Sequence, residues 1–148
     1  MTIIFSKSCE YGIQAILYLA KKNSPKPVLL REISDTLDIP YYFTSKVLKS
    51  LTRDGITNSY KGATGGYELG RKANKIMLIE IVHAIDGRKF LDECVLGFPG
   101  CNDKHHCPVH NNWKKAKKII NDILTKKSVM YLAKDMDTKL KFIQSQKK

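Results

Sequence analysis

The chain has 148 residues, which suits one compact domain or a small domain with an oligomerisation arm. An apolar content of 43% and a charged content of 27% are ordinary for a globular protein, so the composition argues against a disordered chain. The net charge of +12 favours a polyanionic partner such as nucleic acid, although a cationic surface that only aids solubility fits the composition equally well.

The basic residues are spread unevenly along the chain. Residues 1–86 hold 12 basic and 8 acidic side chains, a net charge of +4. Residues 87–148 hold 14 and 6, a net charge of +8. Most of the excess therefore lies in the second half, and net charge alone does not locate a nucleic-acid surface.

The compartment follows from the start of the chain and from its cysteines. The sequence becomes polar at Ser6-Lys7-Ser8 before a secretory signal forms, and no run reaches the ~20 apolar residues that a membrane-spanning helix needs. We therefore expect a cytoplasmic protein, in which thiols stay reduced. The four cysteines are then expected to be ligands or core residues rather than disulfides.

Two short helices joined by a tight turn are predicted after a first helix over residues 10–22. They cover residues 29–37 and 41–54, and Pro40 at the end of the turn suits the start of a helix. This arrangement is typical of a helix-turn-helix, although any pair of packed helices can share it.

The helix over residues 41–54 has an apolar and a polar face. Its buried stripe is expected to contain Phe43, Val47, Leu48 and Leu51. Its outer face is expected to expose the polar and basic side chains of Tyr41, Tyr42, Thr44, Ser45, Lys46 and Lys49.

A β-hairpin is predicted directly after these helices. Residues 56–60 and 66–69 have the composition of strands, and the basic, glycine-containing tip Lys61-Gly62-Ala63-Thr64-Gly65 joins them. A helix-turn-helix followed by such a hairpin is a winged helix. Its recognition helix would enter the major groove of DNA, and its wing would lie along the backbone or minor groove with Lys61 as its cation.

The rest of the chain is predicted to be helical apart from one irregular segment. A helix over residues 75–86 is followed by loop-like residues 90–107, a long helix over residues 108–126 and a short helix capped by Ser128. The fold class is thus mainly α with a small β-hairpin wing. The predicted units are a winged helix over residues 1–87, a cysteine-containing segment over residues 88–107, and a dimerisation helix with a short C-terminal helix or tail over residues 108–148.

The long helix has an apolar stripe with little chain left to cover it. A second copy of the chain would bury this stripe economically, so we expect a two-fold homodimer, which suits a palindromic operator. The lysines of this helix are then expected to face solvent. The stripe consists of Trp113, Ala116, Ile119, Ile120, Ile123 and Leu124.

Three cysteines follow a C-x6-C-x5-C pattern at Cys94, Cys101 and Cys107, with His110 three residues beyond. Three thiolates in one irregular segment can converge on an iron–sulfur cluster, in which histidine can replace a cysteine. Zinc in a Cys3His site is the chemical rival, but zinc modules usually contain C-x2–4-C pairs, which this chain lacks. Three thiols without a metal are the remaining alternative.

Several segments resemble one family of bacterial regulators. The densest match is KGATGGYELGRKANKIMLIEIVHAID, supported by SKSCEYGIQAILYLA, IPYYFTSKVLKSLTRDGI, CPVHNNWKKAKKIINDIL and SVMYLA. Together they resemble the IscR/NsrR/CymR-type (BadM/Rrf-type) winged-helix regulators, over nearly the whole chain. The resemblance implies a homodimer that binds double-stranded operator DNA in a sequence-specific way, and we expect a repressor.

The resemblance also implies which residues contact DNA. On the recognition helix these are Tyr41, Tyr42, Thr44, Ser45 and Lys46, and on the wing they are Lys61, Gly62 and Ala63. Many family members have an arginine where this chain has Lys61. Lysine keeps the charge without the planar fork, so minor-groove recognition is expected to be weaker here.

The resemblance further implies that Cys94, Cys101 and Cys107 hold an iron–sulfur cluster, with 2Fe–2S favoured and 4Fe–4S possible. His110 stands where regulators of cluster biogenesis have their histidine ligand, and Glu10 is the alternative, supplied by the partner's first helix. Such a cluster would sense redox state, nitric oxide or cluster supply, and it can be lost in air.

The sequence leaves two alternatives to this hypothesis and argues against a third. A cluster-free regulator of the same family would respond through its thiols, and a zinc-stabilised interaction module would have no operator. An enzyme is not expected, because the sequence has no phosphate-binding glycine loop, no nucleophile elbow and no C-x-x-C pair.

Overall fold

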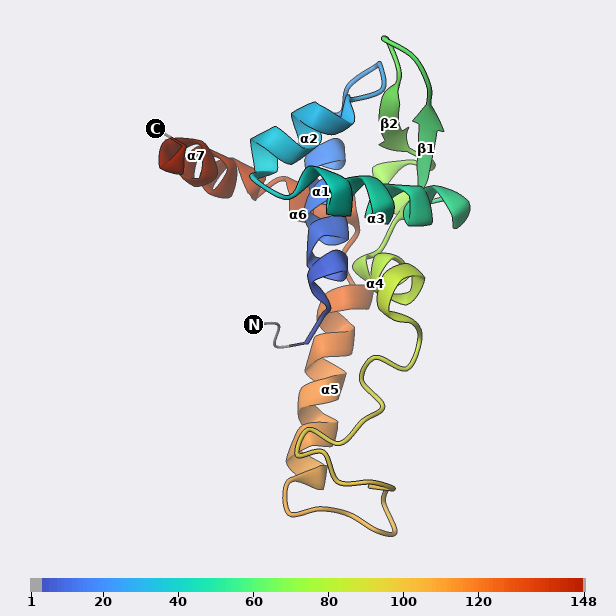
Figure 1. The fold of residues 1–148 in the computed structure, drawn as a ribbon. Coiled ribbons are helices and arrows are strands. Elements are labelled where there is room, and N and C mark those ends of the chain that lie inside the picture. The colour runs from blue at the N-terminus through green and yellow to red at the C-terminus, as the bar shows by residue number, and fades with distance from the viewer. Residues whose placement is uncertain (1–3, 148) are drawn as a thin grey trace.

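The computed structural model describes residues 4–147 and confirms the expected fold class of helices with a two-stranded wing (Figure 1). In chain order the elements are α1 (Lys7–Lys22), α2 (Leu30–Leu37), α3 (Tyr41–Arg53), β1 (Thr57–Tyr60), β2 (Gly66–Leu69), the 3-10 turn η1 (Ala73–Lys75), α4 (Leu78–Asp86), α5 (His110–Thr125), α6 (Val129–Ala133) and α7 (Met136–Gln146). Over residues 4–147, no helix combines the length and apolar character needed to cross a membrane.

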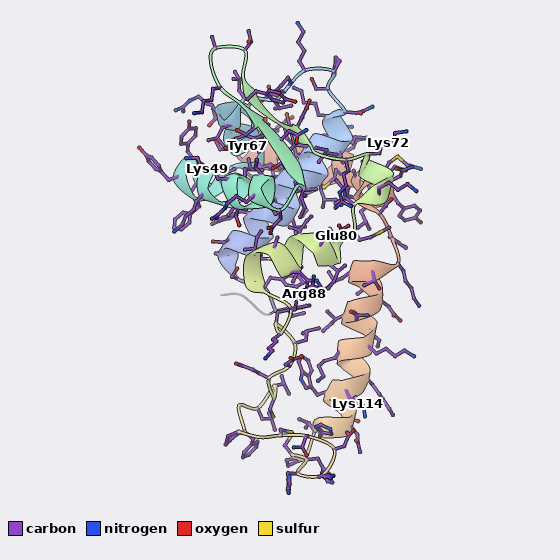
Figure 2. The ribbon with its side chains drawn as sticks, turned by 90° about the vertical axis from the view of Figure 1, so that its right-hand side faces the viewer. Lys49, Tyr67, Lys72, Glu80, Arg88 and Lys114 are labelled. Atoms are coloured by element: carbon purple, nitrogen blue, oxygen red, sulfur yellow. The ribbon has the colours of Figure 1, made fainter. Side chains whose placement is uncertain are left out.

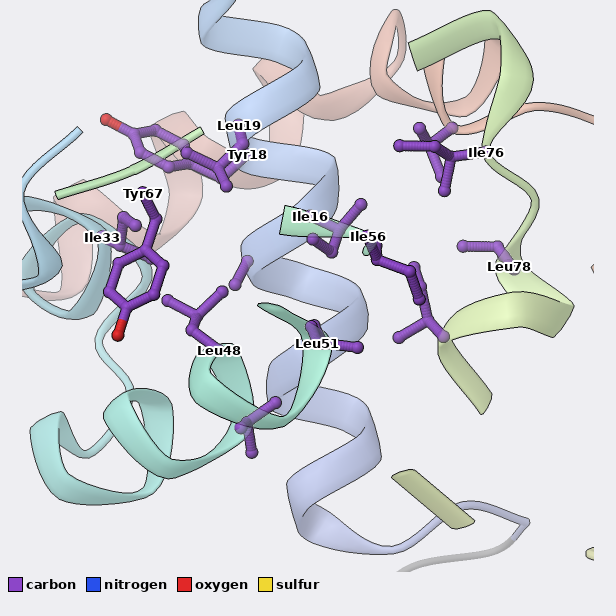
Figure 3. Close-up of a cluster of buried hydrophobic side chains, with 14 of the residues drawn as sticks. Ile16, Tyr18, Leu19, Ile33, Leu48, Leu51, Ile56, Tyr67, Ile76 and Leu78 are labelled. Atoms are coloured by element: carbon purple, nitrogen blue, oxygen red, sulfur yellow. The ribbon is translucent and has the colours of Figure 1, made fainter. Parts of the chain in front are cut away.

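Helix α1 is the centre of the core. Its N-terminus is capped by the Ser6 hydroxyl, which accepts a hydrogen bond from the Cys9 backbone N–H at 3.1 Å. Ser6 in turn donates its own backbone N–H to Asp86 at the end of α4. Helices α3, α4 and α6 pack around α1, and Figure 3 shows Ile16 of α1 among the apolar side chains that fill this space. The winged helix therefore has a continuous apolar core.

The helix-turn-helix and the wing are joined by backbone hydrogen bonds. The turn after α2 places Asp38 in the left-handed conformation, and α3 begins directly after Pro40. The hairpin pairs Thr57 with Leu69, and residue 28 bonds to β2 through two N–H···O contacts of 2.8 Å with Tyr67. These contacts fix the wing beside α2.

The predicted faces of α3 are wrong at two residues. Thr44 is only 1% exposed, whereas Phe43 is 54% exposed. The buried stripe therefore runs through positions 44, 47, 48 and 51, which is the regular i, i+3, i+4, i+7 spacing of a helix. The Thr44 hydroxyl is satisfied in the core because it donates to the Pro40 carbonyl at 2.8 Å.

The C-terminal region returns to the winged helix. The irregular segment 87–109, here called the cysteine loop, leads from α4 to the far end of α5 (Figure 1). Helix α6 then packs on α1, and the Val129 N–H donates to the Ile76 carbonyl at 2.8 Å. Helix α7 lies where the sequence predicts a short helix or tail. It contacts α2 and is joined to α1 by a Lys21–Asp137 ion pair of 3.1 Å.

The wing geometry requires a glycine at position 66. Its φ of +134° is unfavourable for side chains, and a Cβ there would lie 2.2 Å from the Val28 carbonyl oxygen. We expect Gly66→Ala to lower the free energy of unfolding by about 3 kcal/mol, since backbone strain and steric overlap add. Chemical denaturation measures this change, with the exposed tip variant Thr64→Ala as the control. Equal stability of the two variants would contradict the prediction.

Candidate nucleic-acid interface and metal centre

The outer face of α3 carries most of the predicted DNA contacts. Tyr42 is 85% exposed, and Tyr41 and Lys46 are also exposed, while Ser45 is half-buried. An aromatic side chain this exposed makes almost no contribution to the core. Thr44 is the exception, because its burial removes it from the surface that DNA could reach.

Arg31 of α2 belongs to the same surface, although it was not predicted from the sequence. Its guanidinium lies 5.0 Å from the centre of the Tyr41 ring, which is a cation–π contact. The two residues are ten positions apart on different helices, so only the packing of α2 against α3 reveals the pair. Arg31 is exposed and therefore free to reach a phosphate.

The wing extends this surface beyond α2 and α3 (Figure 1). Lys61, Gly62 and Ala63 are all exposed at its tip. The Gly65 N–H donates to the Gly62 carbonyl at 3.0 Å, which closes the turn, and Gly62 adopts a φ of +97°. Helix α3, which carries the exposed Lys49 (Figure 2), packs against β1 of the hairpin. The recognition helix and the wing can thus contact one ligand together.

The cysteine loop brings three thiols together beside the start of α5. The Sγ atoms of Cys94, Cys101 and Cys107, here called the cysteine triad, all lie within 4.8 Å of one another. The Sγ atoms of Cys94 and Cys107 lie 3.6 Å apart. His110, the first residue of α5, places its Nδ1 3.3 Å from the Sγ of Cys101.

The donor set fits a metal centre. Two thiolates bound about 2.3 Å from one tetrahedral metal ion lie roughly 3.8 Å apart. This is close to the 3.6 Å between Cys94 and Cys107 and within the 4.8 Å that bounds all three pairs. Three sulfur donors and one imidazole nitrogen suit either an iron–sulfur cluster or a single zinc ion. The irregular backbone of the loop is compatible with both.

The thiols of the triad differ in acidity. Burial opposes ionisation of Cys94, but hydrogen bonds from the backbone N–H groups of Phe98 and Leu96 and from the other two thiols together lower its pKa. Burial raises the pKa of Cys107, an effect that the Val109 N–H only partly offsets. Hydrogen bonding to His110 and the charge of Lys114 lower the pKa of the nearby Asp103 carboxyl.

The remaining candidate ligands lie outside the triad. Cys9 is buried on α1, where burial and the neighbouring Asp86 carboxylate raise the pKa of its thiol to about 12. Glu10 forms an ion pair of 3.0 Å with Lys7 on the same helix. The start of α1 contacts the beginning of the cysteine loop, where the Phe5 and Phe90 rings lie 5.8 Å apart between centroids. The part of the loop beside the start of α5 lies away from α1 (Figure 1), and Glu10 does not join the triad of its own chain.

These features define a winged-helix DNA-binding protein with a cysteine-rich metal-type site. Residues 5–135 match the Rrf2 family model, which is described as an iron-dependent transcriptional regulator. The chain therefore belongs to the Rrf2 family of transcriptional regulators. This membership confirms the predicted family and identifies the chain as a DNA-binding regulator.

Individual relatives agree with this assignment. The chain is 29% identical over 128 residues to the HTH-type transcriptional regulator IscR of Xenorhabdus nematophila, covering 86% of this chain and 77% of that one. It is 31% identical over 122 residues to an inferred HTH-type transcriptional regulator of Aquifex aeolicus, covering 81% and 84%. The family and these relatives are regulators rather than enzymes, as predicted.

Solved structures share the fold. The T. potens IscR structure has a TM-score of 0.69 and 25% identity, covering 93% of this chain and 90% of that one. The structure of CymR, the global cysteine regulator of B. subtilis, has a TM-score of 0.76 and 21% identity, covering 92% and 100%. The second likeness shows the fold alone.

Proposed function

We propose that the chain is a homodimeric, sequence-specific regulator whose operator binding is controlled by an iron–sulfur cluster. Cys94, Cys101 and Cys107 would hold the cluster, with His110 as the fourth ligand. The observation that carries this proposal is the convergence of the three thiols beside the start of α5, where the His110 ring contacts one of them, Cys101. When bound, the cluster supplies a reactive centre, joined to the cysteine loop and α5, that oxidants or nitric oxide can modify. The regulator would act in the cytoplasm, where its operator lies.

Two arguments favour iron over zinc. The matching family model is described as iron-dependent, and the chain has no C-x2–4-C pair of the kind that zinc modules use. A 2Fe–2S cluster is the simplest choice for three cysteines and one histidine, because histidine replaces cysteine in some clusters of this type.

The dimer is proposed from the outer face of α5. Ile119 and Ile123 are 63% and 58% exposed, one turn apart on the same side of the helix. Two large apolar side chains at this spacing favour burial against a second copy of α5. We accordingly assign DNA binding to residues 1–87, cluster binding to 88–107 and dimerisation mainly to 108–148.

The position of the cysteine loop suggests how the cluster would control DNA binding. The loop joins α4, which packs on α1 and α3, to α5, the proposed dimer helix. A cluster bound by the loop would restrict the loop's conformation, and would thereby hold α5 in one orientation relative to the recognition helix α3. The two recognition helices of a dimer must reach both half-sites of an operator at one fixed spacing. A change in the orientation of α5 relative to α3 would therefore change operator affinity.

Anaerobic purification tests the proposal. The absorption spectrum and the contents of iron, acid-labile sulfide and zinc should show visible charge-transfer bands with iron and sulfide in equal amounts. Colourless protein that contains zinc would identify a zinc-stabilised module instead.

A cluster-free thiol switch is the second candidate. The separation of 3.6 Å between the Sγ atoms of Cys94 and Cys107 favours it. After a small movement of the loop, an oxidant such as a peroxide could take two electrons from these thiols, which would lose their protons and form a disulfide. Colourless protein that contains neither iron nor zinc would support this alternative.

Arg31 is proposed as a phosphate contact of the DNA complex. Loss of one phosphate contact weakens binding to all sequences alike and lowers the slope of log K against log salt by about 0.9. In the proposed homodimer Arg31→Gln removes two such contacts, one from each subunit, so we expect the slope to fall by about 1.8 together with a threefold to tenfold lower affinity. Fluorescence anisotropy over a salt series measures both, with the exposed Asp35→Asn on the same helix as the control. An unchanged slope would remove Arg31 from the interface.

A further inference from the structure

The carboxylate of Asp103 connects the candidate fourth ligand to α5. Its Oδ1 lies 2.9 Å from the Nε2 of His110, and both of its oxygens lie 3.1 Å from the Nζ of Lys114. Lys114 follows His110 by four positions and lies on the end of α5 beside the cysteine loop (Figure 2). One acidic residue of the loop thus contacts two residues of the helix.

A closed turn holds Asp103 in this place. The Asn102 side-chain oxygen accepts backbone N–H groups from Lys104 and His105, each at 2.9 Å. The Asn102 N–H donates to the His105 carbonyl at 3.2 Å, so the turn is bonded on both sides. Asp103 lies inside this turn, and its carboxylate is therefore oriented toward α5 by local structure.

The two ring nitrogens of His110 have different partners. An ionised carboxylate can only accept hydrogen bonds, so the Nε2 facing Asp103 must carry the proton. In a neutral imidazole the other nitrogen, Nδ1, then keeps a free lone pair. This Nδ1 is the atom that lies 3.3 Å from the Sγ of Cys101.

We propose that Asp103 is a positioning residue that makes Nδ1 of His110 the nitrogen offered to the cluster. Carboxylates commonly orient metal-binding histidines in this way, by accepting the proton of the second ring nitrogen. The inference rests on the proposed function, because it needs a cluster at the triad. Asp103 and Lys114 are both exposed, so their ion pair adds little to folding stability, and the effect of Asp103 falls on ring orientation.

The orientation can first be tested without a cluster. In the apo protein, 15N NMR of the histidine rings at a pH where they are neutral should show His110 with its proton on Nε2. Asp103→Ala should give a mixture of the two tautomers, and Asp103→Glu should restore the single form. Wild-type protein with the proton on Nδ1 would overturn the inference whatever the metal content.

The loaded protein gives the second test. Pulsed EPR of the reduced cluster, with histidine labelled by 15N at either Nδ1 or Nε2, should show strong coupling to Nδ1 only. Asp103→Ala should release iron to a chelator about tenfold faster than wild type. Asp92→Ala, which removes an equal charge from the same loop, should release iron at the wild-type rate.

The outcomes separate the two proposals. Coupling to Nε2, or equal release rates for Asp103→Ala and Asp92→Ala, would overturn the role of Asp103 while leaving the cluster in place. A cluster without histidine coupling would overturn both His110 as ligand and this inference. Wild-type protein that forms no cluster under anaerobic reconstitution would overturn the proposed function, and with it the role of Asp103.

Discussion

Replacing Cys101 with alanine should abolish the cluster while the winged helix stays folded. Cys101 Sγ lies 3.3 Å from His110 Nδ1, so its loss removes one proposed ligand and the sulfur contact of a second. Three remaining ligands cannot complete the coordination of a cluster. We expect near-complete loss of iron, sulfide and visible absorption after anaerobic reconstitution.

The fold should tolerate this change. Cys101 lies in the irregular loop and is not part of the hydrophobic core, so the free energy of unfolding of the apo protein should change by less than about 0.5 kcal/mol. Cys9→Ala is the matched control, because Cys9 lies inside the core on α1. It should cost about 1 kcal/mol of stability and keep the cluster. Cys101→Ala protein that keeps its iron would contradict the ligand assignment.

Two neighbouring residues of α3 should behave in opposite ways. Tyr42→Ala should reduce operator affinity by about ten- to a hundredfold, the usual effect of losing a base contact, without changing the free energy of unfolding. Its side chain is 85% exposed and contributes almost no core packing. Thr44→Val should leave operator affinity near the wild-type value and lower the free energy of unfolding by about 1 kcal/mol, because the hydrogen bond to the Pro40 carbonyl is lost.

Both variants can be assayed with a DNA duplex selected from a random pool by the anaerobic protein. Denaturation gives their stabilities, and anisotropy titration gives their affinities at one salt concentration. If Thr44→Val lost operator binding at unchanged stability, Thr44 would contact DNA and would not be a buried core residue. If Tyr42→Ala bound normally, Tyr42 would not be a DNA contact.

The helix-turn-helix and the wing were predictable because local signals place them. Pro40 marks the start of α3, and the glycine-containing tip marks the turn of the hairpin. The faces of α3 were harder to predict, because a large apolar residue was expected inside. Phe43 instead lies at the edge of the core, where its ring contacts Tyr11 of α1 at 6.4 Å between centroids. Whether Phe43 or Thr44 faces the core depends on tertiary packing and not on composition.

Helix α7 was missed because its sequence gives a weak signal. It is rich in lysine and polar residues, and it has no fully buried side chain among those described. What holds it in place is tertiary: a partly buried Leu140 against the core and the Lys21–Asp137 ion pair. A weakly amphipathic segment of this kind is easily mistaken for a tail.

The candidate metal centre was only partly predictable. Cysteine spacing indicated the triad, and the structure adds that the three sulfurs converge without a disulfide. The contact between Asp103 and His110 has no sequence signal, because it depends on a loop turn meeting the first turn of a helix. The pairing of Arg31 with Tyr41 was hidden for the same reason.

Operator affinity with and without the cluster tests the central claim most directly. The selected duplex should be titrated under anaerobic conditions with reconstituted wild-type protein, with the same protein after chelation of its iron, and with Cys101→Ala. We predict that the loaded protein differs from both cluster-free forms by about tenfold or more, a coupling of ordinary size for an allosteric regulator. Equal affinities for all three, maintained across a salt series, would contradict control of DNA binding by the cluster.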